Sequence, residues 1–236
     1  MKRSEINHII DEAIAFLDEM KFKLPPFAHW TPTEWQQKGA DCRDIVRQNL
    51  GWDITDFGSG EFDRVGLFLF TLRNGTAAAA AAGTGRSYAE KVMIVQENQV
   101  TPCHTHKAKM EDIINRGGGG LVVQLWADNG ATAPDAAAPV TVKLDGVERT
   151  VAAGEKVVLD PGASITLEPG HFHSFWGAPG RGTTLVGEVS QVNDDTTDNY
   201  FVPACGRFPD VVEDQPPVRL LIPDYPDYCD PALLPV

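Results

Sequence analysis

The chain has 236 residues and carries a formal net charge of −13, with a sequence pI near 4.8. Nucleic-acid and anionic-membrane partners require a basic surface, so this acidity argues against both. With 42% hydrophobic and 22% charged residues, the composition is that of a folded globular protein rather than a disordered one.

Residues 1–60 are expected to form a helical extension. Apolar side chains recur with helical period from Ile6 to Met20, Ser4 is the candidate N-cap, and Pro25-Pro26 ends the pattern. A second short helix is expected from about Asp41 to Leu50. The extension should pack on the domain that follows it.

Residues 61–200 change to short β-rich runs separated by turn residues. Asp145-Gly146 lies between two alternating runs, which indicates a β-hairpin. Strands at this spacing, without helices between them, are typical of a sandwich or a barrel. The expected strands are Val65 to Leu72, Glu90 to Gln96, Gly120 to Trp126, Val140 to Leu144, Glu148 to Val151, Lys156 to Leu159, Ser164 to Leu167, His173 to Trp176 and Thr183 to Ser190.

Two further segments are expected to lie on the surface. The alanine run at residues 77–82 lies between Gly75 and Gly83 and is interpreted as a loop. Residues 201–236 are rich in proline, which prevents regular elements, and should wrap the same domain as a tail.

The compartment follows from the cysteines and the N-terminus. No apolar run approaches the roughly 18 residues that a membrane helix requires, and the first residues are not those of a signal peptide. The cysteines have no CxxC spacing and are expected to be free thiols in a reducing, cytoplasmic setting. They are Cys42, Cys103, Cys205 and Cys229.

The strongest candidate for chemistry is His104-Thr105-His106, followed by Glu111. In an extended segment the side chains repeat with period two, so both imidazoles face one side. A bend over the four intervening residues can return the Glu111 carboxylate to the same cation. The alternative is a pair of surface histidines beside an unrelated glutamate. Cys103 alternates with His104 and is therefore disfavoured as a ligand.

A further ligand is expected after the turn at Glu168-Pro169-Gly170. His171 and His173 both follow this turn, and position alone leaves the choice between them open. Imidazole and carboxylate ligands suit Mn, Fe, Zn, Ni or Co better than Mg or Ca. Three histidines and one glutamate leave coordination positions open for a substrate, so the set predicts a catalytic site with one divalent metal.

These spacings carry a resemblance. HxHx4E followed by PGxxH among many short strands resembles the cupin superfamily, and the longer strings resemble the bacterial D-lyxose ketol-isomerases. The resemblance implies a mainly β fold, a cupin jelly-roll β-barrel with N-terminal helices. It covers roughly Tyr88 to Tyr200. The strings are Glu111 to Gly119, Pro169 to Trp176 and Gly187 to Asp195.

The resemblance also implies site residues. It favours His173 over His171 as the ligand, because the family motif does not require histidine at position 171. This sequence departs from the family motif at Glu168, where the family often has a proline. It implies that Lys109 and Glu188 handle protons; the alternatives are a solvated lysine and a glutamate facing solvent on an edge strand.

The implied activity is metal-dependent aldose–ketose isomerisation. It would interconvert D-lyxose and D-xylulose, and D-mannose and D-fructose, by proton transfer between C1 and C2 through an enediolate on a divalent cation. Mn²⁺ is the expected metal, with Co²⁺, Zn²⁺, Fe²⁺ and Ni²⁺ as alternatives.

Three residues are candidates for binding the sugar. Arg116 would contact a hydroxyl, or else form a salt bridge that fixes the glycine-rich loop. Trp176 would stack on the sugar, or else belong to the core. Asp195 would bind the substrate, or else cap a turn.

Other functions compete with isomerisation. A metal-dependent dioxygenase and a non-catalytic sugar-binding cupin fit the same ligands, and a phosphosugar isomerase is a nearer rival that the acidic charge disfavours. A free sugar is the expected partner. Exposed barrel edges make a homodimer the expected assembly.

Overall fold

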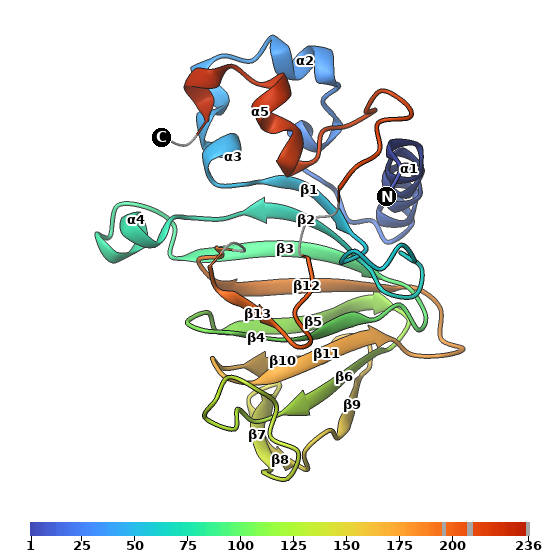
Figure 1. The fold of residues 1–236 in the computed structure, drawn as a ribbon, viewed down its shortest axis with the longest axis vertical. Helices are drawn as coiled ribbons and strands as arrows, with labels where there is room; N and C mark the ends of the chain where they lie inside the picture. The colour runs from blue at the N-terminus through green and yellow to red at the C-terminus, as the bar shows by residue number, and fades with distance from the viewer. Residues whose placement is uncertain (195–196, 207–209, 235–236) are drawn as a thin grey trace.

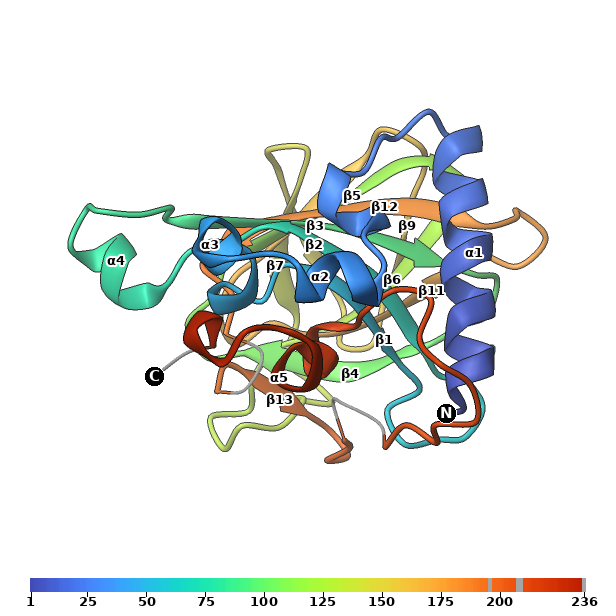
Figure 2. The same ribbon diagram turned by 90° about the horizontal axis from the view of Figure 1, so that it is seen from above.

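The computed structural model describes residues 1–194, 197–206 and 210–234, and its main feature is a pair of antiparallel sheets with helices against one of them (Figures 1 and 2). The larger sheet has eight strands, in the order β1 (Gly51–Thr55), β2 (Leu67–Arg73), β3 (Tyr88–Val95), β12 (Thr184–Gln191), β5 (Glu111–Gly118), β10 (Ser164–Leu167), β7 (Val140–Leu144) and β8 (Val147–Val151). The smaller sheet has five, in the order β13 (Asn199–Phe201), β4 (Thr101–His106), β11 (Phe172–Gly177), β6 (Leu121–Trp126) and β9 (Lys156–Leu159).

The inner faces of the two sheets share one apolar core. Alternate residues of the larger sheet, such as Leu69, Met93 and Ile113, pack with Val123 and Phe175 of the smaller sheet. This period of two is what a sheet with one face toward the core requires. The predicted mainly β fold is confirmed.

The long helix α1 (Arg3–Glu19) covers the outer face of the larger sheet (Figure 2). Ile6 and Ile10 pack there against Phe68 and Phe70 of β2. Strand β2 is therefore apolar on both faces, which explains its uninterrupted run of apolar residues. The helix begins two residues earlier than expected, and its N-cap is Lys2 rather than Ser4. The Ser4 hydroxyl instead donates to Asp214 Oδ2 at 2.7 Å.

The first 60 residues are less helical than expected. Short helices η1 (Pro26–His29), α2 (Pro32–Gln36), η2 (Ala40–Cys42) and α3 (Arg43–Arg47) follow α1, but β1 lies within the range predicted to be a helical extension. All five residues of β1 are buried, and its pairing with β2 makes it part of the larger sheet. Burial on both faces removed the alternation that would have revealed a strand.

The alanine run is a helix, so the prediction of a loop is wrong. Helix α4 (Ala77–Ala81) begins after Thr76, whose side chain accepts a hydrogen bond from the Ala79 amide. Alanine has the highest helix propensity, and this N-cap offsets the shortness of the segment.

The C-terminal tail contains regular elements, contrary to expectation. It forms η3 (Ile222–Asp224), α5 (Tyr225–Tyr228) and η4 (Pro231–Leu233), and proline occupies early helical positions where it costs no hydrogen bond. Tyr225 and Leu220 are buried against Trp35 and Val46. The tail is thus part of a core rather than a surface wrapping.

The predicted β-hairpin is confirmed. The hairpin at Asp145-Gly146 joins β7 and β8, and both residues have positive φ. None of the four cysteines forms a disulfide. Among the helices of the described residues, none combines the length and apolarity that a bilayer crossing demands.

Arg3 attaches the tail to α1, and its loss should destabilise the protein. Its guanidinium is 1% exposed and donates to both carboxylate oxygens of Asp224, at 2.9 and 2.8 Å, and to Glu213. Arg3→Met should lower the free energy of unfolding by about 3 kcal/mol, because Asp224 stays buried without its counterion. Urea unfolding measures this. Arg64→Met, at an exposed ion pair with Glu61, should change the free energy of unfolding by less than about 0.5 kcal/mol. Equal effects of the two substitutions would contradict the role of Arg3.

Candidate active site

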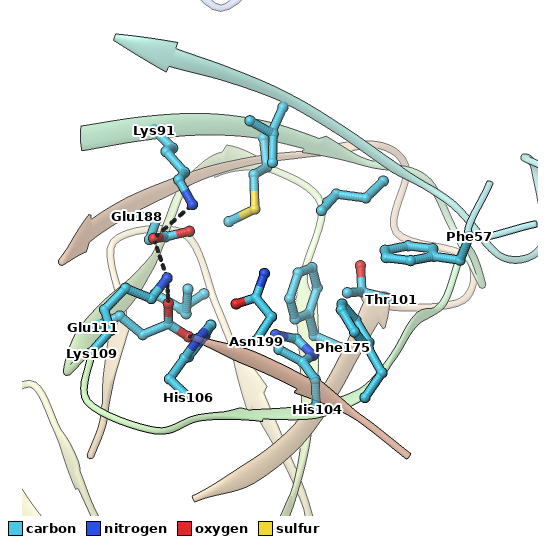
Figure 3. A pocket seen from close by; sticks show the side chains of 15 residues that line it. Phe57, Lys91, Thr101, His104, His106, Lys109, Glu111, Phe175, Glu188 and Asn199 are labelled. Atoms are coloured by element: carbon cyan, nitrogen blue, oxygen red, sulfur yellow. Dashed lines mark hydrogen bonds and ion pairs between the residues drawn. The ribbon is translucent and has the colours of Figure 1, made fainter. Parts of the chain in front are cut away.

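Strands of both sheets direct polar side chains into one cavity inside the barrel (Figure 3). Strand β4 carries His104 and His106, and β11 places His173 directly opposite His104. The larger sheet contributes Glu111 at the start of β5 and Glu188 on the adjacent β12. Residues far apart in sequence thus meet because their strands are paired or face each other.

The three histidines form a cluster suited to a metal ion. One ring nitrogen of each lies within 4.8 Å of the others, and all three side chains are buried. His104 Nδ1 donates to the Pro102 carbonyl at 2.8 Å, and His173 Nδ1 to the His171 carbonyl at 3.1 Å. A carbonyl can only accept, so Nδ1 carries the proton and Nε2 keeps its lone pair. Burial holds the pKa of His104 well below its ordinary value, which favours the neutral, ligating form.

Glu111 lies beside this cluster. Its Oε1 is 3.2 Å from His106 Nε2 and 3.3 Å from His173 Nε2, and its Oε2 forms an ion pair with Lys109 Nζ at 2.8 Å. Burial alone would raise the pKa of Glu111, but His106 and Lys109 hold it well below its ordinary value. Within the described part of the chain, Nε2 of His106 and of His173 is buried without a well-formed hydrogen bond. Buried nitrogens without partners are costly, and a divalent cation would satisfy them, so these residues fit a metal.

Asp198 orients His106 from outside the cluster. Its Oδ2 lies 3.4 Å from His106 Nδ1, and its Oδ1 accepts from the Ala108 amide at 2.8 Å. Carboxylates in this position fix the ring of a ligating histidine.

Asp198→Asn should therefore weaken metal binding by about tenfold. The asparagine side chain keeps an oxygen that can accept from the backbone N–H of Ala108. Its NH2 group would then face His106 Nδ1 in place of the carboxylate oxygen. A competition titration with a chelator measures the affinity. Asp145→Asn, at the distant hairpin, is the control. Equal affinities in the two variants would show that Asp198 does not act on His106.

A buried ion-pair network adjoins the histidine cluster. Glu188 Oε1 accepts from Lys109 Nζ at 2.9 Å and lies 3.4 Å from Lys91 Nζ. Burial alone would raise the pKa of Glu188, but Lys109 and Lys91 outweigh it and lower that pKa. Glu188 is thus a carboxylate at neutral pH, in the state that a general base needs.

The cavity is polar on one side and apolar on the other (Figure 3). The network and the histidines occupy one side, next to Asn199 of β13. Such a division suits a small polar ligand whose reactive end meets the charged groups. The apolar residues that line the cavity are Phe57, Leu67, Leu69, Met93, Ile113, Phe175 and Phe201.

Two predicted sugar-binding residues do not reach the cavity. Arg116 is exposed, and its side chain crosses the backbone of β12, where a Cβ at Gly187 would lie 3.0 Å from its Nε. Trp176 alternates with Phe175, which lines the cavity, and the ammonium of Lys156 lies 5.3 Å from its ring centre. Asp195, the third such prediction, lies outside the described residues.

His171 also lies outside the histidine cluster. It is half-buried in the turn before β11, and its Nδ1 accepts from the Glu168 amide at 3.2 Å. Of the two histidines left open by position, it is His173 whose ring nitrogen joins His104 and His106.

Sequence reasoning assigned no role in the site to Lys91 or Asn193. A signal existed for Lys91, since a lysine within the buried run of β3 needs a partner. None existed for Asn193, whose Oδ1 accepts from Lys91 Nζ at 2.9 Å and Lys109 Nζ at 3.3 Å across long sequence separations.

Known structures share this architecture. The L-ribose isomerase of Cellulomonas parahominis, solved with L-ribose, superposes with a TM-score of 0.58 over 90% of this chain and 98% of its own, at 17% identity. An L-ribose isomerase of Acinetobacter sp. DL28 gives 0.55 over 86% and 92%, at 18% identity. The fold is that of the cupin-type barrels.

Sequence comparison specifies the family. The D-lyxose isomerase family model matches residues 1–225. The D-lyxose/D-mannose isomerases of Serratia proteamaculans and Escherichia coli O157:H7 are 48% and 46% identical over 227 residues, which is 95% of this chain and 98% of each relative. The chain belongs to the D-lyxose isomerase family and is a sugar isomerase.

Proposed function

We propose that this enzyme interconverts D-lyxose with D-xylulose and D-mannose with D-fructose. The observation that carries the proposal is the buried Glu188–Lys109 pair beside three histidines in a single cavity. The relatives at 48% and 46% identity, named D-lyxose/D-mannose isomerases, support the choice of sugars.

Glu188 and Lys109 are proposed to move the protons. Isomerisation takes a proton from C2 of the aldose and returns it to C1, while a hydroxyl proton passes from O2 to O1, so no co-reactant is consumed. The Glu188 carboxylate is the base for the carbon-bound proton. Lys109 Nζ donates a proton to O1 and regains one from the O2 hydroxyl, while its contact with Glu188 Oε1 keeps it beside the base.

His104, His106, His173 and Glu111 are proposed to hold one divalent metal. Three imidazoles and a carboxylate suit Mn²⁺, our preferred ion, and also Co²⁺, Zn²⁺, Fe²⁺ or Ni²⁺. When bound, such an ion supplies Lewis acidity that stabilises negative charge on the sugar oxygens. The ligand residues themselves keep their rings fixed through backbone carbonyls and Asp198.

A panel of free sugars tests the proposed function. We expect turnover of D-lyxose and D-mannose with Mn²⁺, and a loss of at least about 100-fold after chelation, because Lewis acidity supplies several kcal/mol. Ketose formation is measured for each aldose with Mn²⁺, Co²⁺, Mg²⁺ and no added metal. Turnover of neither sugar with any metal would refute the substrate assignment, and undiminished turnover after verified metal removal would refute the metal.

A homodimer in the cytoplasm is proposed as the setting. The free cysteines suit a reducing compartment, and the strands at the sheet ends leave edges that a second copy can cover. Light scattering coupled to size-exclusion chromatography measures the assembly, and a monomeric mass would contradict the dimer.

A further inference from the structure

Lys91 is a buried lysine that the proposed reaction does not use. It is 4% exposed on β3, and the strand register places it directly opposite Glu188 on β12. Removing an ammonium group from water costs several kcal/mol unless it is well paired. A lysine at this position therefore requires a strong interaction in the folded protein, and Glu188 provides one.

Both lysines approach the same oxygen of Glu188. Lys91 Nζ lies 3.4 Å from Oε1, and Lys109 Nζ lies 2.9 Å from it. The two ammonium groups reach this oxygen from opposite sides, while the second oxygen points toward the cavity (Figure 3). No residue in the described ranges donates a hydrogen bond to Oε2. The two lysines therefore fix Glu188 Oε1, and Glu188 Oε2 is the oxygen that faces the cavity.

Asn193 holds Lys91 in turn. Its Oδ1 accepts from Lys91 at 2.9 Å, and its own backbone is fixed by Asn74. Asn74 Oδ1 accepts from the Asn193 amide, and Asn74 Nδ2 donates to the Asn193 carbonyl, both at 3.0 Å. Lys91 is therefore anchored to a second fixed side chain, which Lys109 also contacts, and cannot simply follow the Glu188 carboxylate if it rotates.

Lys109 cannot hold Glu188 alone during turnover. It also forms an ion pair with Glu111 Oε2 at 2.8 Å, and in the proposed function it must turn toward a sugar oxygen. Proton return to C1 requires the carboxylate to keep the position it had at C2, because misplacement by about 1 Å can cost 100-fold in rate. Lys91 has no other role in the proposed reaction.

We propose that Lys91 is a positioning residue, held by Asn193, which keeps Glu188 Oε1 in place so that Oε2 transfers the proton between C1 and C2. This inference rests on the proposed function for its catalytic consequence. Its structural consequence, the fixed orientation of Glu188, does not depend on which sugar the enzyme accepts.

Kinetics of Lys91→Met provide the first test. We expect kcat to fall by about 10- to 100-fold, with KM changed by less than about threefold, because the loss acts on the transition state. Lys91→Arg should recover part of the rate. Lys143→Met, the same change at a lysine 52% exposed on β7, should leave both constants unchanged. A raised KM with normal kcat would show that Lys91 binds the sugar instead, and would overturn the proposal.

A double variant separates positioning from an independent role. If Lys91 acts through Glu188, adding Lys91→Met to Glu188→Gln should lower the residual rate no further. Full additivity of the two losses would contradict the proposal. Asn193→Ala should also lower kcat without raising KM, and it can be measured even if Lys91→Met does not fold. An unchanged kcat in Asn193→Ala would count against the proposal.

A crystal structure of Lys91→Met supplies a readout independent of turnover. We expect the Glu188 carboxylate to rotate, so that Oε1 no longer accepts from Lys109 as it does at 2.9 Å. An unmoved carboxylate would overturn the positioning role even if lyxose and mannose are good substrates. Failure of the wild type on both sugars, with a rotated carboxylate in the variant, would contradict the proposed function alone.

Discussion

Glu188→Gln is expected to lower kcat on D-lyxose by about 10²- to 10⁴-fold, the usual contribution of a general base. Glutamine preserves the shape of the side chain but offers no basic oxygen near neutral pH. In the wild type, Lys109 and Lys91 keep the pKa of Glu188 low despite its burial, so the basic form is present. The metal content should stay near that of the wild type, since Glu188 contacts lysines rather than the histidines.

Initial rates at saturating sugar, together with metal analysis of the purified protein, measure both expectations. Glu90→Gln is the matched control, because Glu90 lies on neighbouring β3 but pairs with Arg73 at the surface. It should leave kcat within about twofold of the wild type, as surface changes usually do. A near-normal rate in Glu188→Gln would remove this residue from the mechanism. A joint loss of metal and rate would instead indicate that Glu188 supports the metal site.

Several strands of the barrel were predictable because one face is buried and the other is not, although Glu111–Gly118 alternates in the same way and was not predicted. Val140–Leu144, Lys156–Leu159 and Ser164–Leu167 begin and end at the predicted residues because their alternation is clear. Gly51–Thr55 was missed because it is buried on both faces. The helix Ala77–Ala81 was missed because the flanking glycines indicate a loop, whereas the helix propensity of alanine and the Thr76 N-cap favour a helix.

The histidine cluster was predictable from the sequence, and its surroundings were less so. The period of two brought His104 and His106 to one face, and family resemblance pointed to His173, Lys109 and Glu188. Pairing between distant strands carries no local signal, so nothing in the sequence placed Lys91 opposite Glu188. The lack of a local signal also explains why Trp176 was predicted to bind the sugar. The face on which it lies depends on the register of β11 with β6, which the aromatic sequence does not reveal.

His173→Ala is expected to weaken Mn²⁺ binding by more than about 100-fold. Loss of a residue that merely orients a ligand typically costs 10- to 100-fold, and loss of a ligand should cost more. His173 is 1% exposed, and its Nε2 faces Glu111 Oε1 at 3.3 Å with no other partner in the described residues. The remaining histidines would have to hold the ion with one nitrogen fewer.

His171→Ala is the matched control, because it removes the same group two residues away. The His173 ring keeps its support there, since Nδ1 donates to the backbone carbonyl of residue 171, which alanine retains. Mn²⁺ should therefore raise the melting temperature of His171→Ala as it does that of the wild type, and should raise that of His173→Ala far less, because stabilisation by a ligand scales with its affinity. The reverse order would make His171 the ligand. Equal retention of metal in both variants would mean that His104, His106 and Glu111 suffice, and that His173 serves the cavity in another way.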